Sequence, residues 1–430
     1  MVGNSDNRKV DFTVLWIGLA AFATYSCMYA FRKSFSVGVF EGIYYLGLDF
    51  KSLLIITQSI GYMISKFIGI KFISELKKGA RIKLILTLIG ISELALILFS
   101  WIPAPHNFWC LFLNGLPLGM IWGIVFSYLE GRSTTELLGV MLSISFIMAS
   151  NISKSVAQWL LVSFNVSEFD MPYITGLLFA LPLLISVYFL NRAPEPSESD
   201  IKHRLKRVPM TASSRNKSLK IIWPTMLLLV VSYILLTVFR DVRSNYASDV
   251  WNELGFQNVP SIYITSSLPS SAIIILLMSL LYLIKDNWKA LFSIEWMIFL
   301  GFTSLGICSL LYETGIISSV VWVISMMTAT YLAYIPFNCF IFERIIPTYH
   351  LSGSNIGFLI YIADAFGYFG SVLVLLHKNL FSPDINWLHY LLRCSYLVAV
   401  IGAVLSVFVL IRFQLKQKKQ AIDYGKLRLQ

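Results

Sequence analysis

The stretch Tyr25-Ser-Cys-Met-Tyr29-Ala-Phe-Arg32-Lys33-Ser-Phe35 places two adjacent cations inside a long apolar run. An arginine near the centre of a bilayer costs roughly 2.5–3.5 kcal/mol on insertion scales, so such a residue usually faces a bundle interior or an aqueous cavity. Tyr25, Tyr29 and Arg32 are spaced four and three residues apart, which puts them on one helical face. Two phenol hydroxyls beside a forked guanidinium predict an anion site.

An alternative is that Arg32 and Lys33 end a first span that begins near Phe12, and that they reach outward to the lipid headgroups. Two observations favour the deeper position. The other strong basic clusters fall on the opposite side of the membrane from this helix end. A helix that runs on through Val37 to Phe40 would also place Arg32 deeper than a helix that ends at Lys33.

The composition excludes an ordinary soluble domain. The chain has 430 residues, of which 57% are hydrophobic and 13% are charged, with a mean hydropathy of +0.72. Soluble domains carry about 25% charged residues. We therefore expect an all-α polytopic membrane protein with twelve transmembrane helices, each long enough to cross about 30 Å of hydrocarbon. The apolar stretches are 12–36, 52–73, 82–102, 107–129, 138–163, 172–191, 221–247, 261–284, 289–311, 316–342, 353–377 and 388–413.

Neither the cysteines nor the histidines indicate a metal or redox site. The five cysteines lie inside apolar spans without close pairing, and the five histidines form no ligand cluster. The sequence contains no phosphate-binding loop. We therefore expect no cofactor, no metal and no enzymatic activity.

The basic residues follow the membrane topology. The net charge of +11 falls on alternate connections, whereas the other connections carry acids and few cations, so nucleic acid is not an expected partner. Positive loops stay on the cytoplasmic side, which places both termini there in a multi-pass protein of the cell (inner) membrane. The basic connections hold Arg8 and Lys9, Lys77 to Lys83, Arg132, the linker 192–220, Lys285 and Lys289, Arg344 and the tail from Lys416 to Arg428.

One long polar segment, 192–220, divides the twelve spans into six and six. Two six-helix halves joined by a basic loop are the layout of the major facilitator architecture, in which the substrate binds between the halves near the midplane. The expected organisation is an N-terminal half at 1–191, a cytoplasmic linker at 192–220, a C-terminal half at 221–413 and a basic tail at 414–430.

The ordered motifs resemble those of the organophosphate:phosphate antiporter family, the group of glycerol-3-phosphate and hexose-phosphate transporters. They are Tyr25-x3-Tyr29-x2-Arg32-Lys33-x-Phe35, Gly61-x4-Lys66-Phe67, Gly119-Met120-x-Trp122 and Gly131-Arg132. The resemblance implies that the matching tyrosines, arginine and lysines line an anion pocket. In the fifth span the family has a His-Asn pair, whereas this chain has Ser150-Asn151 and, one turn further, Lys154.

The seventh span reads Arg240-Asp241-Val242-Arg243 and again interrupts an apolar helix with charge. Arg240 matches the family's second essential arginine, the pseudo-symmetric counterpart of Arg32. Asp241 and Arg243 are additional. We expect Arg243 to form an internal ion pair with Asp241 or Asp364.

Spans ten and eleven supply Tyr334-x-Pro336 and Asp364-x3-Tyr368, and the resemblance implies that both tyrosines reach toward the substrate. Asp364 has two expected roles, as a counter-ion of an arginine or as a proton-coupling group. Glu343 and Arg344 are expected to form a gating or topology pair at the cytoplasmic end.

These observations predict a facilitator that moves a small anion by alternating access, a phosphorylated metabolite in exchange for inorganic phosphate, and that acts as a monomer in the lipid bilayer. Two alternatives stay open: a proton-coupled carrier of another organic anion, and a receptor that binds a phosphate ester and signals through the linker or tail. The expected substrate-binding residues are Arg32, Arg240, Lys33, Lys66, Lys154, Tyr25, Tyr29, Tyr334 and Tyr368, with Asp364, Asp241 and Arg243 as coupling groups or counter-ions.

Overall fold

The computed structural model describes residues 12–45, 47–76, 78–196, 210–351, 354–381 and 386–428. Part of the basis for the topology prediction lies outside these ranges, namely Arg8, Lys9, Lys77 and positions 197–209 of the linker.

Twelve helices in the described part of the chain are long and apolar enough to cross a membrane, which confirms the predicted number of spans. They alternate in direction along the chain. The spans are α1 (Phe12–Lys33) with η1 (Ser34–Val37), α2 (Phe50–Glu75), α3 (Arg81–Trp101), α4 (Phe108–Leu118) with α5 (Ile121–Phe126), α6 (Thr135–Phe164), α7 (Met171–Asn191), α9 (Ala212–Asn245), α11 (Ser261–Tyr282), α12 (Asn287–Glu313), α13 (Ser319–Cys339), α15 (Ile356–Phe381) and α16 (Trp387–Arg428).

The connections contain short elements. They are the antiparallel strands β1 (Tyr44–Tyr45) and β2 (Leu48–Asp49), and the helices η2 (Lys78–Ala80), α10 (Ala247–Glu253) and α14 (Ile341–Thr348). Asp49 ends β2 and caps α2, because its carboxylate accepts a hydrogen bond from the Ser52 amide at 2.9 Å.

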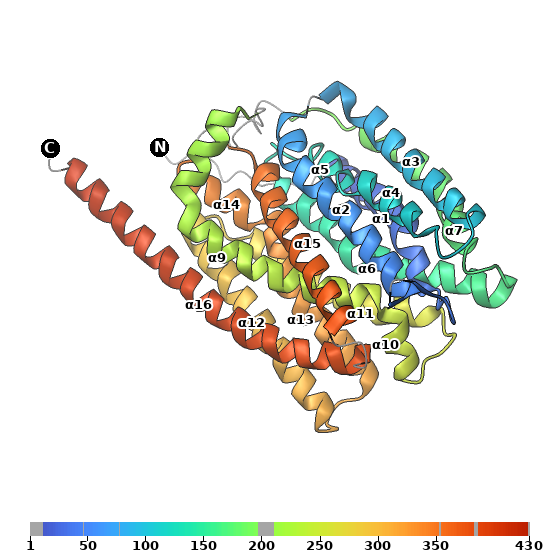
Figure 1. Ribbon diagram of the computed structural model, residues 1–430. Helices are drawn as coiled ribbons and strands as arrows, with labels where there is room; N and C mark the ends of the chain where they lie inside the picture. The colour runs from blue at the N-terminus through green and yellow to red at the C-terminus, as the bar shows by residue number, and fades with distance from the viewer. Residues whose placement is uncertain are drawn as a thin grey trace.

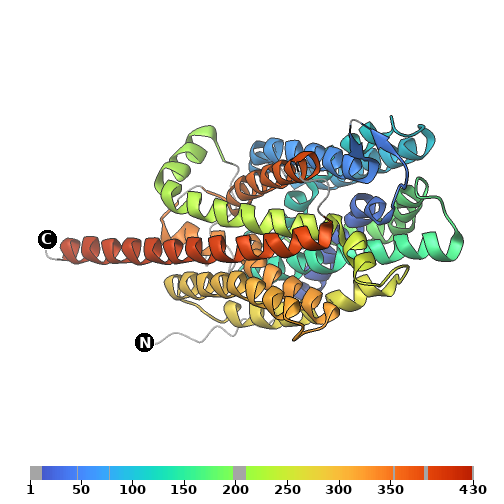
Figure 2. The same cartoon turned by 60° about the horizontal axis from the view of Figure 1, so that its bottom comes forward.

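Helices α1 to α7 and helices α9 to α16 occupy neighbouring parts of the bundle (Figure 1). Three helix pairs provide most of the packing between these parts: α2 packs against α15, and α6 packs against both α11 and α13. We call the end of the bundle where α9 begins the linker side and the opposite end the far side. Helix α16 extends beyond the other helices on the linker side (Figure 2).

The first span changes character at the charged stretch. The α-helix ends at Lys33 and continues as the 3-10 helix η1 to Val37, so the first span ends close to the predicted residue 36 and does not run on to Phe40. The fourth span is also interrupted, between α4 and α5 at Gly119. A Cβ atom added to Gly119 would lie 2.8 Å from the Tyr62 carbonyl oxygen, so this glycine allows α2 to approach closely.

Two glycines of α2 allow neighbouring helices to approach closely. A Cβ added to Gly61 would lie 2.4 Å from the Phe112 carbonyl oxygen on α4, and one added to Gly69 would lie 2.4 Å from the Tyr361 ring on α15. Helix α2 therefore packs directly on the backbone of α4 at Gly61, whereas at Gly69 the Tyr361 ring of α15 lies against its backbone.

Candidate anion-binding site

Two arginines from different parts of the bundle meet at one tyrosine. Arg32 lies in the last turn of α1 and Arg240 near the end of α9, and they are 2% and 4% exposed. Arg32 Nη1 donates to the Tyr368 hydroxyl at 3.4 Å, and Arg240 Nη2 donates to the same oxygen at 2.8 Å. Because Arg32 and Lys33 are both buried, the alternative that they reach the headgroups is wrong.

Aromatic rings surround the two guanidinium groups. Arg240 also donates through Nη1 to the Tyr334 hydroxyl. The Arg32 guanidinium carbon lies 3.5 Å from the centroid of the Tyr62 ring, whose face attracts a cation electrostatically. The rings of Tyr62 and Tyr368 are themselves in contact, with centroids 4.6 Å apart. The arginines are thus held by phenols rather than by acids.

The buried acids pair with lysines. Lys33 lies 3.6 Å from Asp241, and Lys66 lies 2.6 Å from Asp364. No carboxylate of the described residues lies within 4.0 Å of Arg32 or Arg240. Buried charges are normally paired with an opposite charge, so Arg32 and Arg240 lack the kind of partner that Lys33 and Lys66 have.

The expected ion pair of Arg243 is wrong. Asp241 faces α1 and α15, where it contacts Lys33 and accepts a hydrogen bond from Ser371 at 2.8 Å. Arg243 instead points toward α13, where its Nη2 donates to the Tyr331 hydroxyl at 3.4 Å. Positions two residues apart on a helix point about 200° apart, which explains why Asp241 and Arg243 do not meet.

Asp364 does not pair directly with an arginine, so the expected counter-ion role toward an arginine is also wrong. Its carboxylate accepts hydrogen bonds from Lys66 at 2.6 Å and from the Tyr233 hydroxyl. Tyr233 also contacts the Tyr334 hydroxyl at 2.6 Å, and Tyr334 accepts a hydrogen bond from Arg240. A chain of two phenols therefore connects Asp364 with Arg240.

Lys154 and Tyr25 are not hydrogen-bonded to Arg32 or Arg240. The Lys154 ammonium on α6 donates to the Ser244 carbonyl oxygen near the end of α9. The Tyr25 ring packs edge-on against Tyr29 and Phe146, with centroids 5.4 and 5.7 Å away. Tyr25 thus supports Tyr29 from the side.

The arginines border a small central cavity of about 10 Å³. That volume is roughly the room for one water, so the cavity must widen before it holds a larger ligand. Four of the predicted binding residues and one predicted counter-ion line this cavity. The lining residues are Tyr29, Arg32, Lys33, Phe146, Arg240, Asp241, Ser244 and Tyr331.

Three tyrosines of the site were not predicted individually. Tyr62 lies four residues before Lys66, and Tyr331 lies three residues before Tyr334, so each shares a helical face with a predicted residue. This spacing could have identified both tyrosines from the sequence. Tyr233 lies seven residues before Arg240, two helical turns away on the same face, so the same signal was present but more distant.

On the linker side, the bundle is closed by buried polar contacts. Arg344 Nη2 donates to Glu136 Oε2 of α6 at 2.8 Å, so the partner of Arg344 is on another helix rather than the neighbouring Glu343. The Glu130 carboxylate accepts the Ile356 amide at 3.0 Å.

On the far side, Lys51 donates to Asp249 and to Ser248, each at 2.8 Å. Asp249 is the more exposed partner of this pair, with a side chain 29% exposed. Polar contacts between the two parts of the bundle therefore lie on both sides of the central cavity.

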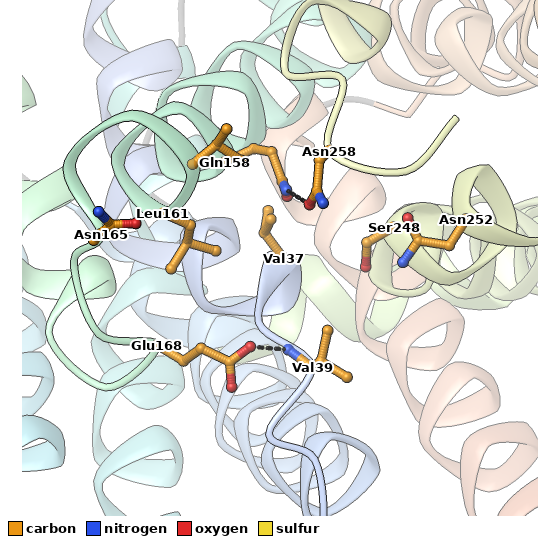
Figure 3. Close-up of a pocket in the computed structure, with 10 residues that line it drawn as sticks. Val37, Val39, Gln158, Leu161, Asn165, Glu168, Ser248, Asn252 and Asn258 are labelled. Carbon is orange, nitrogen blue, oxygen red and sulfur yellow. Dashed lines mark hydrogen bonds between the residues drawn. The ribbon is translucent and has the colours of Figure 1, made fainter. Parts of the chain in front are cut away.

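A larger cavity of about 440 Å³ opens on the far side (Figure 3). Gln158 donates to Asn258 at 3.2 Å across this cavity, and the Glu168 carboxylate accepts the amides of Val39 and Phe40. Ser244, near the end of α9, lines the central cavity, and Ser248, in the first turn of α10, lines the far-side cavity, so the junction of these two helices lies between the cavities.

Comparison with known proteins agrees with the fold. The chain resembles the solved structure of a bacterial homologue of the human drug peptide transporters PepT1 and PepT2, with a TM-score of 0.55 and 14% sequence identity over 95% of this chain and 98% of that chain. This similarity concerns the fold, an all-α polytopic fold of the major facilitator type. No curated protein matches the chain.

Residues 34–416 match the model of a family described as "Family of unknown function (DUF5690)". The match covers most of the chain, and the protein belongs to this family. Neither comparison names the organophosphate:phosphate antiporters, so that finer resemblance stays a proposal.

Proposed function

We propose that this protein is a secondary transporter that moves a small phosphorylated anion across the membrane in exchange for inorganic phosphate. The observation that carries the proposal is the meeting of Arg32 and Arg240 at the Tyr368 hydroxyl without a carboxylate of the described residues within 4.0 Å. Guanidinium groups match the oxygens of phosphate through pairs of charge-assisted hydrogen bonds. The Nε atom of Arg32 has no hydrogen-bond acceptor and is available as a further donor.

The charge around the central cavity supports an anionic ligand. Six buried cations and two buried carboxylates leave an excess of four positive charges in this region. The cations are Arg32, Arg240, Arg243, Lys33, Lys66 and Lys154, and the carboxylates are Asp241 and Asp364. A phosphate ester carries close to two negative charges at neutral pH and would offset part of this excess.

Binding would be coupled to movement through the positions of the two arginines. Arg32 belongs to the expected N-terminal half at 1–191, and Arg240 belongs to the expected C-terminal half at 221–413. An anion that both arginines contact draws the halves together, and it favours the conformations in which both contacts form. The polar contacts at the two ends of the bundle would then open in turn.

The proposal is tested by counterflow in proteoliposomes. Vesicles that contain the purified protein and unlabelled phosphate should accumulate labelled phosphate, and phosphate esters should compete at the same site. A neutral analogue and a dipeptide serve as controls, the latter because the structurally similar protein is a homologue of peptide transporters. If the dipeptide or the neutral analogue competes as well as the phosphate ester, the anion proposal is wrong. Binding without flux would instead favour the receptor alternative.

We further propose that both termini and the linker face the cytoplasm in the cell (inner) membrane, and that the protein is a monomer. The charged connections support this orientation, because positive loops are retained on the cytoplasmic side. Single cysteines introduced at Ser213 and Gln420 on the linker side, and at Asn258 on the far side, should react with a membrane-impermeant reagent from opposite faces of the membrane. Labelling of the linker side from outside the cell would overturn the orientation.

A second candidate function is proton-coupled transport of another organic anion. The chain from Asp364 through Tyr233 and Tyr334 to Arg240 favours this candidate, because it joins a buried carboxylate to the anion site. Uptake would then depend steeply on a proton gradient, and Asp364→Asn would remove that dependence. Exchange that is insensitive to a proton gradient in both forms of the protein would exclude this candidate.

A further inference from the structure

A second pair of buried cations lies next to the arginine pair. Arg243 is one helical turn beyond Arg240 on α9, and Lys154 lies opposite it on α6. The two residues are 6% and 1% exposed, and no carboxylate of the described residues lies within 4.0 Å of either. Two buried charges without an ion-pair partner require a compensating interaction from elsewhere.

The present acceptors of these cations are neutral. The Nη2 atom of Arg243 donates to the Tyr331 hydroxyl at 3.4 Å, and its Nε atom has no acceptor. The Lys154 ammonium has three donors and is bonded to the Ser244 carbonyl oxygen. Hydrogen bonds to an anionic acceptor are roughly twice as strong as those to a neutral one, so an anion would replace both acceptors favourably.

Both neutral acceptors line the central cavity. Ser244 and Tyr331 form part of its wall, and Arg32 and Arg240 form another part. The Tyr331 hydroxyl donates its proton to the Phe146 carbonyl oxygen at 2.6 Å, so its own oxygen is oriented to accept from Arg243. A ligand group that takes the place of these acceptors would lie in the same cavity as a group held by the arginine pair.

The other charged groups nearby are already compensated. Lys33 and Asp241 line the same cavity and lie 3.6 Å from each other. Lys51, toward the far side, is bonded to Asp249 at 2.8 Å. Arg243 and Lys154 are therefore the two cations beside this cavity that can still bind a second anionic group.

We propose that the site binds a single organic molecule with two anionic groups, one held by Arg32 and Arg240 and the other by Arg243 and Lys154. The inference rests on the proposed function, because it takes the arginine pair as the phosphate site. Arg240 and Arg243 are separated by about 4.5 Å along the helix axis, which suits two groups joined by a short carbon chain. The ligand class is a phosphate ester that also carries a carboxylate.

The test compares 3-phosphoglycerate with glycerol 3-phosphate, which differ by a carboxylate in place of a hydroxymethyl group. Each ligand is used to displace labelled phosphate from the purified full-length protein. We expect 3-phosphoglycerate to bind at least about tenfold tighter, as the hydrogen bonds to an additional charged group would provide. Free glycerate added together with glycerol 3-phosphate should not reproduce the gain, because the two groups are then not linked.

Variants of Arg243 and Lys154 test whether these two residues provide the higher affinity for 3-phosphoglycerate. Arg243→Gln and Lys154→Gln should bring the ratio of the two dissociation constants close to one. Arg243→Lys and Lys154→Arg, which keep the charge, should retain part of the preference. Arg215→Gln is the matched control, because Arg215 pairs with Glu75 on the linker side and should leave the ratio unchanged. Size-exclusion chromatography verifies that every variant is monodisperse.

The outcomes separate this inference from the proposed function. If neither ligand displaces phosphate, the arginine pair is not a phosphate site and the proposed function fails. If both ligands displace phosphate with equal affinity, or if the charge-removing variants keep the preference, only the second anion position is overturned.

Discussion

The two arginines and the two lysines at the centre of this protein carry the same charge but have different partners. Lys33 and Lys66 lie 3.6 and 2.6 Å from the carboxylates of Asp241 and Asp364. Arg32 and Arg240 are equally buried, but they share the hydroxyl of Tyr368. The difference indicates two roles, since a cation with a buried acid is already neutralised whereas a cation held by phenols can still accept an anion.

The chemistry of lysine and arginine side chains agrees with these two different roles. A lysine offers a single ammonium, which one carboxylate satisfies as a point charge. An arginine offers a planar fork of donors that matches two oxygens of a phosphate. This comparison can be tested by exchanging the cation or by removing its partner, and the variants below do so in order of decreasing effect.

The largest effect is expected from Asp241→Asn. This change leaves Lys33 buried without its partner, and removal of one member of a buried ion pair typically costs about 3–5 kcal/mol. Asp364→Asn should have a similar effect through Lys66. The thermal unfolding temperature of the purified variants in detergent is the measurement. Unfolding at the temperature of the unchanged protein would mean that the lysines do not depend on these acids.

Arg32→Lys and Arg240→Lys should each reduce phosphate counterflow by about 100-fold, because an ammonium keeps the charge but loses the paired hydrogen bonds, each worth about 1.5–3 kcal/mol. Their unfolding temperatures should change little, since neither arginine forms an ion pair with an acid of the described residues. Counterflow is measured in proteoliposomes at matched protein content, with Arg215→Lys as a control on the linker side.

Arg243→Lys should reduce counterflow less than Arg240→Lys, because Arg243 belongs to the second cation pair and not to the arginine pair. If Arg240→Lys transports normally while Arg243→Lys is inactive, the assignment of the primary phosphate position to the arginine pair is wrong.

The smallest effect is expected from the double change Lys66→Met with Asp364→Leu. Replacement of a whole buried ion pair by apolar residues of similar volume is often neutral or stabilising. The free energy of unfolding of the double variant should therefore lie within about 1 kcal/mol of that of the unchanged protein, although either single change is destabilising. A double variant as unstable as the single ones would show that Asp364 has a structural role beyond its lysine, for example through Tyr233.

Much of the fold was predictable because membrane crossing imposes a local requirement. A span needs a continuous apolar segment of sufficient length, and that property is visible in the residues themselves. The number of spans followed from this requirement and is confirmed. The ends were less predictable where the backbone changes form, as at Ser34, where the 3-10 helix begins, and at Gly119, where the fourth span is interrupted.

The residues around the candidate anion site were predictable by a second local argument. Arg32 and Arg240 interrupt apolar helices, and a cation in a membrane span needs a special environment. Their burial agrees with that argument. The same argument identified Lys33, Lys66, Lys154 and Asp364 as special, but it did not state which of them meet.

The sequence by itself determined that the chain crosses the membrane twelve times and that particular charges lie buried among the helices, because both follow from the transfer of each residue out of water. The tertiary structure alone decided the pairing of those charges. Asp241 pairs with Lys33 rather than with Arg243, and Arg344 pairs with Glu136 rather than with Glu343. The strength of an ion pair depends steeply on distance in a medium of low dielectric constant, and the distance between two helices is set by the packing of the whole bundle.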